Sequence, residues 1–180
     1  MFKKYSQPEK WILIGIPMLF LIGSLFHFLY EMTGKLKVIA AISATNESVW
    51  EHCKMVVLPV ILWWGLYYIF RGNEYNINAN KWFTTSLVAM VTAIITMPMS
   101  YYFYTQAFGV EILAVDIFLL FFVLILGQCL GLHVFKYHKG MNIWIALFLI
   151  SIVLVIFIVF TFYQPHLPIF MDGVNHTYGI

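Results

Sequence analysis

Histidine and carboxylate side chains lie close together in the first third of the chain, at spacings that suit proton transfer or metal binding. His27 and Glu31 are four positions apart in the string H-F-L-Y-E. On a helix, side chains with this spacing project from one face, one turn apart. A carboxylate so placed can orient an imidazole and raise its basicity, which suits a general base or a metal ligand. The alternative is a structural pair that anchors the end of a helix.

A second polar group lies in the string T-N-E-S-V-W-E-H-C-K, where Thr45 or Asn46 is a natural N-cap for a helix. From that cap, Glu47 and Glu51 stack at i and i+4. Two carboxylates one turn apart repel each other unless a proton, a cation or Lys54 lies between them. This spacing predicts a metal ion or a shared proton, and the alternative is helix capping with a solvated face.

The C-terminal segment 164–180 adds a further acid. It contains two prolines, two histidines, Asp172 and no Lys or Arg, and its apolar Leu167, Ile169 and Phe170 would be unusual on a solvated end. We expect this tail to fold back and bring Asp172 toward the other acids. A free tail is the alternative.

These groups predict one carboxylate and histidine site. The candidate catalytic residues are His27, Glu31, Glu51 and His52. The candidate ligands of a divalent cation are Glu47, Glu51, His52 and Asp172. Further polar residues expected near the site are Asn46, Lys54, Glu111 and Asp116.

Long apolar segments supply the elements that must position these residues. Hydrophobic residues make up 62% of the chain and charged residues 10%, with a mean hydropathy of +0.87. A soluble domain carries about a quarter charged residues, and a membrane span needs about 20 apolar ones. We therefore predict an all-α, polytopic transmembrane bundle in a single domain over residues 1–180. Its spans are expected at about 11–30, 53–70, 82–104, 110–134 and 141–163.

The connection 31–52 between the first two spans is longer than a plain loop requires. Its part 35–44 is apolar, which predicts a short interfacial or re-entrant helix.

The basic residues divide unevenly between the two sides of a five-span chain. Lys35, Lys37 and Lys54 fall on the side of the connection 31–52. The other seven fall on the side of the N-terminus: Lys3, Lys4, Lys10, Arg71, Lys81, Lys136 and Lys139. The positive-inside rule then predicts a cell-membrane protein with a cytoplasmic N-terminus and an extracytoplasmic tail. The lipid bilayer is the expected partner, and a net charge of +2 with scattered basic residues argues against nucleic acid.

Three strings of this chain resemble a family of small bacterial membrane proteins known as a domain of unknown function (6512). They are H-F-L-Y-E at 27–31, A-T-N-E-S-V-W-E-H-C-K at 44–54, and P-I-F-M-D-G at 168–173 with the closing Y-G-I. The family string reads P-V-N-E-S-x-W-E-H-x-K, from which this chain departs at Ala44 and Thr45. The resemblance covers nearly the whole chain, and it implies the five-span fold and no activity.

Three classes of function remain open on these patterns. The leading one is a membrane-embedded enzyme that acts on a lipid or small-molecule substrate, with a divalent cation or with metal-free acid/base chemistry by His27 or His52. A proton- or cation-linked transporter or channel component would instead need a polar path from Glu111 and Asp116 toward Gln128 and His133. In the third class, the chain is a structural subunit of a membrane complex and the polar connection is an interaction surface.

Overall fold

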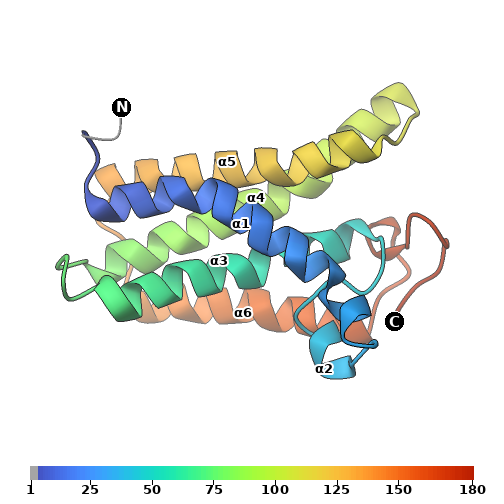
Figure 1. The fold of residues 1–180 in the computed structure, drawn as a ribbon, viewed down its shortest axis with the longest axis horizontal. Coiled ribbons are helices and arrows are strands. Elements are labelled where there is room, and N and C mark those ends of the chain that lie inside the picture. The colour runs from blue at the N-terminus through green and yellow to red at the C-terminus, as the bar shows by residue number, and fades with distance from the viewer. Residues whose placement is uncertain (1–3) are drawn as a thin grey trace.

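Five long helices form an elongated bundle in the computed structural model, which describes residues 4–180 (Figure 1). They are α1 (Gln7–Met32), α3 (Val49–Arg71), α4 (Ala79–Phe108), α5 (Leu113–Tyr137) and α6 (Ile143–Phe162). Each is long and apolar enough to cross a membrane, so the prediction of an all-α, five-span fold is confirmed. The short α2 (Lys37–Ala40) lies where an interfacial helix was predicted, and a 3-10 turn, η2 (Pro168–Phe170), lies in the tail.

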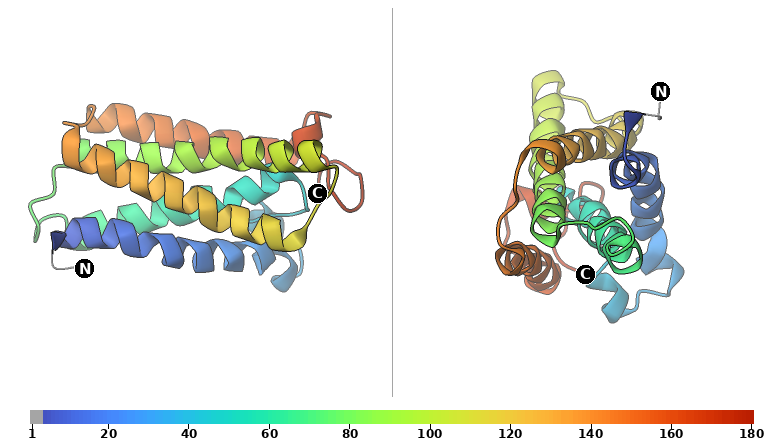
Figure 2. Two further views of the ribbon diagram at one scale, coloured as in Figure 1. Left: turned by 90° about the horizontal axis from the view of Figure 1, so that it is seen from above. Right: turned by 90° about the vertical axis from the view of Figure 1, so that its left-hand side faces the viewer.

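Four of the helices enclose an interior. Successive long helices run in opposite directions along the bundle (Figure 1). Helices α1, α3, α4 and α5 form a ring in which each packs on the next and α5 returns to α1 (Figure 2). Helix α6 packs outside this ring, against α3 and α4, and most of its apolar surface is left for lipid.

Aromatic side chains fill the ring at the end where the N-terminus lies. The ring of Trp11 stacks on those of Trp63 and Tyr67, with centroids 3.9 and 4.6 Å apart. Tyr67 stacks in turn on Trp82 at 5.3 Å, and Trp82 donates its indole N–H to the carbonyl of Trp64 at 2.9 Å. The Trp82 ring also lies 4.5 Å from that of Trp64. We call the side chains of Trp11, Trp63, Trp64, Tyr67 and Trp82 the aromatic plug. They pack together in the interior of the ring at this end.

Glycines bring the helices of the ring into close contact. A Cβ on Gly127 of α5 would lie 2.5 Å from the carbonyl oxygen of Ala89, and one on Gly131 would lie 3.2 Å from the Ala89 Cβ. A Cβ on Gly23 of α1 would similarly lie 2.6 Å from the carbonyl oxygen of Met55 in α3. Small residues one turn apart are a common means of close helix packing in membranes.

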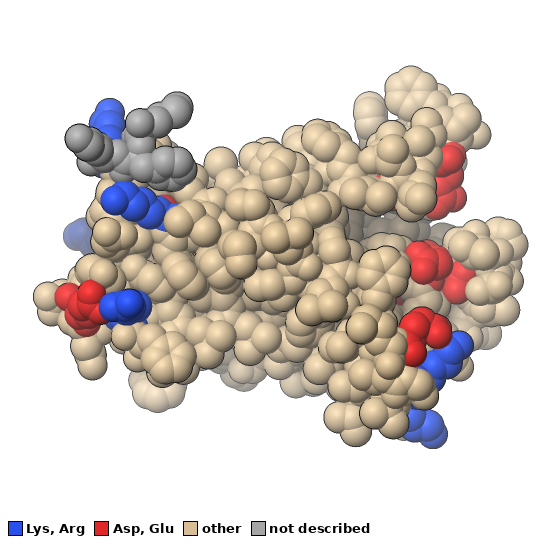
Figure 3. Space-filling view, viewed as in Figure 1, with Lys and Arg blue, Asp and Glu red and all other residues tan. Residues whose placement is uncertain are grey.

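The two ends of the bundle differ in charge (Figure 3). The end with the N-terminus carries six described basic residues, Lys4, Lys10, Arg71, Lys81, Lys136 and Lys139, while Lys3 lies outside the described residues. The other end is formed by α2, the α4–α5 connection and the tail after α6, and we call it the α2 end. It carries most of the acids: Glu31, Glu47, Glu51, Glu111, Asp116 and Asp172.

Helix α3 begins later than expected, which corrects the predicted stacking of Glu47 on Glu51. The N-cap is Ser48, whose hydroxyl accepts a hydrogen bond from the N–H of Glu51 at 3.2 Å. The expected caps, Thr45 and Asn46, lie before the helix, and the Asn46 side chain accepts from the N–H of Ser48 at 3.0 Å to form a turn. Glu47 therefore lies in the connection and not one turn before Glu51.

Candidate functional site

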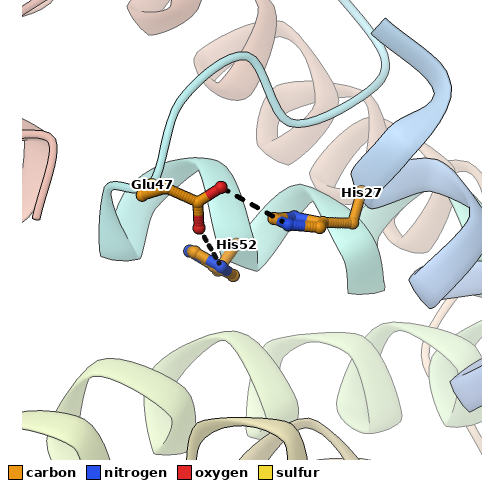
Figure 4. A group of neighbouring side chains, drawn as sticks. All are labelled: His27, Glu47 and His52. Atoms are coloured by element: carbon orange, nitrogen blue, oxygen red, sulfur yellow. Dashed lines mark ion pairs between the residues drawn. The ribbon is translucent and has the colours of Figure 1, made fainter. Parts of the chain in front are cut away.

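Three side chains from separate parts of the chain meet at the α2 end (Figure 4). His27 comes from α1, Glu47 from the connection before α3, and His52 from the first turn of α3. One carboxylate oxygen of Glu47 lies 3.5 Å from Nε2 of His27, and the other lies 3.4 Å from Nε2 of His52. The imidazole rings stack with centroids 5.1 Å apart. We call these three residues the His–Glu–His cluster.

The C-terminal tail holds Glu47 in place. The main-chain N–H of Glu47 donates to Oδ2 of Asp172 at 3.4 Å, and the N–H of Gly173 donates to the carbonyl of Glu47 at 3.3 Å. Oδ1 of Asp172 accepts from the N–H groups of Val174 and Asn175, both at 2.8 Å. Burial alone would raise the pKa of Asp172, but these donors outweigh it and the pKa is lowered.

Two contacts anchor the rest of the tail. The ring of Phe170 in η2 packs on that of Trp50 in α3, with centroids 4.8 Å apart. The side chain of Asn46 donates to the carbonyl of Gly179 at 3.0 Å. The tail thus folds back over the α2 end. Through its contacts with Asn46 and through Asp172, it holds in place the connection that carries Glu47.

The orientation of His52 is fixed by a second contact. Its Nδ1 lies 2.8 Å from the carbonyl oxygen of Ser48, which can only accept, so we assign the Nδ1 proton to this bond. In the neutral imidazole, Nε2 then presents a lone pair to the carboxylate of Glu47. Two acceptors that face each other require a proton or a cation between them. Histidine ligands of metals usually donate their other N–H to a carbonyl or carboxylate in this way.

The carboxyl of Glu47 is anionic at neutral pH. A proton on Nε2 of His52 lets the imidazole donate to Glu47 and holds the pKa of Glu47 below its ordinary value, and burial acts in the opposite direction with less effect. A carboxylate is the form that binds a metal ion.

The cluster has the spacing and donor set of a metal site. All three ligand atoms lie within 4.8 Å of one another. Ligands at zinc bond lengths of 2.0–2.1 Å in a tetrahedron lie about 3.4 Å apart. Each histidine nitrogen lies near this distance from one oxygen of Glu47, but the two contacts use different oxygens of the carboxylate. Two histidines and one carboxylate with an open position are the ligands of several zinc hydrolases and of non-haem iron sites.

The cluster lies on the wall of a cavity of about 790 Å³ between α1, α3, α4, α5 and the tail. Figure 3 shows the surface hollowed at this end, with acidic side chains beside the hollow. Its polar lining consists of Ser24, His27, Glu47, His52, Tyr101, Glu111 and Asp116. Its apolar lining includes Phe20, Met55, Met97 and Leu120. The size is in the range of small-molecule sites, about 300–1,000 Å³.

Glu31 lies apart from the cluster. Its carboxylate pairs with Lys35 at 3.2 Å, and both side chains are exposed. The expected pair with His27 is therefore absent, because Lys35 lies one turn further on and competes for the same carboxylate.

Glu51 and Lys54 form a buried ion pair away from the cluster. Nζ of Lys54 lies 2.6 Å from Oε2 of Glu51 and donates to the carbonyls of Ala40 and Ser43 at 2.8 and 3.1 Å. The same carboxylate oxygen accepts from the N–H and the hydroxyl of Thr45, both at 3.0 Å. This pair clamps the connection before α3, so Glu51 supports the site and is not one of the three grouped ligands. Asp172 is likewise outside that group.

Glu111 and Asp116 line the cavity from the start of α5 and the connection before it. The hydroxyl of Tyr104 donates to Oδ1 of Asp116 at 2.5 Å. Tyr101 and Tyr104 are not among the candidate site residues predicted from the sequence. Tyr101 and Met97, which lies one turn before it on α4, both line the cavity.

The fold and the site together define a multi-pass helical membrane protein with a His–Glu–His cluster at one end of an internal cavity. Comparison with known proteins shows the family. The chain belongs to the family of unknown function DUF6512, whose model matches residues 1–180. No curated protein and no solved structure matches it.

Proposed function

We propose that this protein is a membrane-embedded, metal-dependent enzyme that acts on a substrate drawn from the bilayer. The observation that carries the proposal is the His–Glu–His cluster, whose three ligand atoms lie within 4.8 Å of one another on the wall of a large, mostly apolar cavity. Metal-binding side chains inside a membrane bundle are costly and mark functional sites by default.

The reaction class that suits this site is hydrolysis. A divalent cation held by the cluster would lower the pKa of a water ligand to about 7 and polarise a substrate carbonyl. A bond forms between the water oxygen and the carbonyl carbon, and the bond from that carbon to the leaving group breaks. The proton lost by water passes to the leaving group, and Asp116 on the same cavity is our candidate to carry it.

The charge of the two ends supports an extracytoplasmic site. Six described basic residues lie at the end with the N-terminus. At the α2 end, Lys35, Lys37 and Lys54 are the basic residues, and Lys54 is buried in its ion pair. By the positive-inside rule, this distribution supports a location of the α2 end, and with it the cluster, at the outer leaflet.

Metal-free acid/base chemistry at the same residues is the second candidate. It is favoured by the bond from Nδ1 of His52 to Ser48, which leaves Nε2 free to take a proton beside Glu47. Metal analysis separates the two candidates.

The packing below the cavity supports an enzyme over a transporter. A polar path from Asp116 toward Gln128 would have to cross the buried side chains of Leu120, Val123 and Leu124. Beyond them lie the packed side chains of the aromatic plug.

The test is metal analysis of the purified full chain by mass spectrometry, after exposure to zinc, manganese and iron(II) ions in turn and removal of free ions. The wild type should hold about one ion per chain, and Glu47→Gln and His52→Gln should lose it. Glu31→Gln is the matched control, because it removes a carboxylate at the same end that pairs only with Lys35. A wild type that retains none of these ions contradicts the metal-dependent proposal.

A further inference from the structure

The mouth of the cavity is rimmed by exposed apolar side chains. Phe28 of α1 and Leu113 and Ile117 of α5 line the cavity, yet they are 57%, 75% and 52% exposed. Helices α1 and α5 diverge toward the α2 end (Figure 1). An opening with this rim, in a helix pair that faces lipid, admits a ligand from the bilayer more readily than one from water.

The far end of the cavity suits a hydrocarbon chain. Phe20, Met55, Met97 and Leu120 come from four different helices and line it together. Methionine side chains adapt to irregular apolar ligands. A cavity of about 790 Å³ accommodates one chain and a small headgroup, which favours a single-chain amphiphile.

The polar end of the cavity is negatively charged. Glu47, Glu111 and Asp116 line it, and its described lining residues include neither Lys nor Arg. Of the lysines at the α2 end, Lys35 pairs with Glu31, Lys54 pairs with Glu51, and Lys37 lies in α2 outside the cavity lining. Phosphate groups are recognised by Arg, Lys and N–H donors, so this end disfavours a phosphorylated head. A divalent cation at the cluster would offset two of the three carboxylate charges.

From the mouth, the apolar end and the charge, we propose that the substrate is a single-chain membrane amphiphile with a cationic, amine-bearing headgroup. It enters between α1 and α5, places its chain between Met55 and Met97, and sets its amine against Glu111 and Asp116. This inference rests on the proposed function for the reaction, whereas the binding it describes can be measured without turnover.

The test is photocrosslinking on the full chain in nanodiscs of phosphatidylcholine. The probe is a dodecylamine analogue with a diazirine near the end of its chain, and the adducts are located by peptide mass spectrometry. We expect adducts on peptides that contain Met55 or Met97. Unlabelled dodecylamine should block them at a membrane concentration at least about tenfold lower than dodecyl phosphate, since like charges across a contact are repelled. Equal competition by dodecyl phosphate, or adducts confined to α6, overturns the proposal.

Charge variants test the headgroup assignment. In the double variant Glu111→Gln, Asp116→Asn, the preference for dodecylamine over dodecyl phosphate should fall to near unity. Glu31→Gln, which removes an acid outside the cavity, should keep it. Each variant is first checked for a monodisperse peak in size-exclusion chromatography and for unchanged helical circular dichroism. A preference that survives in a folded double variant contradicts the inference.

The metal variant separates this inference from the proposed function. His52→Gln leaves the three carboxylates of the polar end in place, so it should lose the metal ion and keep both the adducts and the preference for the amine. Adducts with no metal in the wild type would leave the amphiphile site standing and end the metal-dependent enzyme. Metal in the wild type without adducts would overturn the amphiphile site and leave the metal-dependent enzyme standing.

Discussion

The main-chain N–H of Glu47 donates to the carboxylate of Asp172, although 125 positions separate the two residues in the chain. Gly173 completes the contact by donating back to the carbonyl of Glu47. The C-terminal tail is therefore a structural part of the His–Glu–His cluster, because it fixes the peptide that carries the carboxylate.

Removal of the Asp172 carboxylate should weaken metal binding without touching a ligand. In Asp172→Ala, the N–H groups of Glu47, Val174 and Asn175 lose their acceptor, and Glu47 gains freedom. Loss of such a supporting contact typically lowers metal affinity about 10–100-fold. Competition with a fluorescent chelator measures the affinity. His176→Asn is the control in the same tail, since His176 is exposed and Asn tolerates its positive φ; an equal loss there would contradict a specific role for Asp172.

The stabilisation by Glu47 should depend on pH in the metal-free protein. Its folded-state pKa lies below the ordinary value of 4.5, so the unfolded chain takes up the proton first. The contribution of Glu47 is thus fully present above about pH 4.5 and is lost as the pH falls through the folded-state pKa. The difference in Tm between wild type and Glu47→Gln, measured with a chelator present, should shrink between pH 6 and pH 3. A difference that stays constant over this range would show that the carboxylate is not stabilised in the fold.

The buried pair of Glu51 and Lys54 should matter for stability and not for metal content. Loss of one partner leaves an uncompensated buried charge, which typically costs about 3–5 kcal/mol. Lys54→Met should therefore lower Tm strongly, and the double variant Glu51→Gln, Lys54→Met should recover part of the loss. Folded Glu51→Gln should still hold about one metal ion per chain. Loss of the ion from a folded Glu51→Gln variant would show that Glu51 is a metal ligand and contradict its assignment to the ion pair alone.

The contact of α4 with α5 should not tolerate even one added carbon. In Gly127→Ala, the new Cβ would lie 2.5 Å from the Ala89 carbonyl oxygen, so the helices must move apart. Overpacking of this kind costs about 1–3 kcal/mol. Gly65→Ala is the matched control, because no neighbouring atom lies within 4 Å of its added Cβ. Thermal unfolding in detergent should separate the two variants, and equal Tm values would contradict the close packing.

Much of the fold could be predicted from the sequence because the bilayer imposes long apolar segments. The first three predicted spans lie inside α1, α3 and α4, which each extend one to four residues further at both ends. Polar residues continue these helices past the apolar layer, and hydropathy alone cannot detect that. Helix α5 begins at Leu113 and not near residue 110, because Gly109 ends α4 with a left-handed conformation and the chain then turns.

The site was predicted in part. Local spacing indicated His27 and His52 as chemistry-bearing residues and included Glu47 among the candidate metal ligands, but it also favoured Glu31 and Glu51 as partners of the histidines. Both of these acids find a lysine within four positions, and a nearby opposite charge outcompetes a distant imidazole. The position of Glu47 depends on the tail and on where α3 begins, which are tertiary relationships that no local pattern encodes.

The aromatic plug has a consequence for kinetics. In the proposed enzyme, the aromatic plug fills the ring at the end with the N-terminus, so a product would leave at the α2 end, where the substrate entered. A product molecule in the cavity would then exclude the next substrate molecule until it diffuses back into the bilayer. Turnover of the proposed enzyme would then depend on the residence time of the product, and accumulated product would act as a competitive inhibitor.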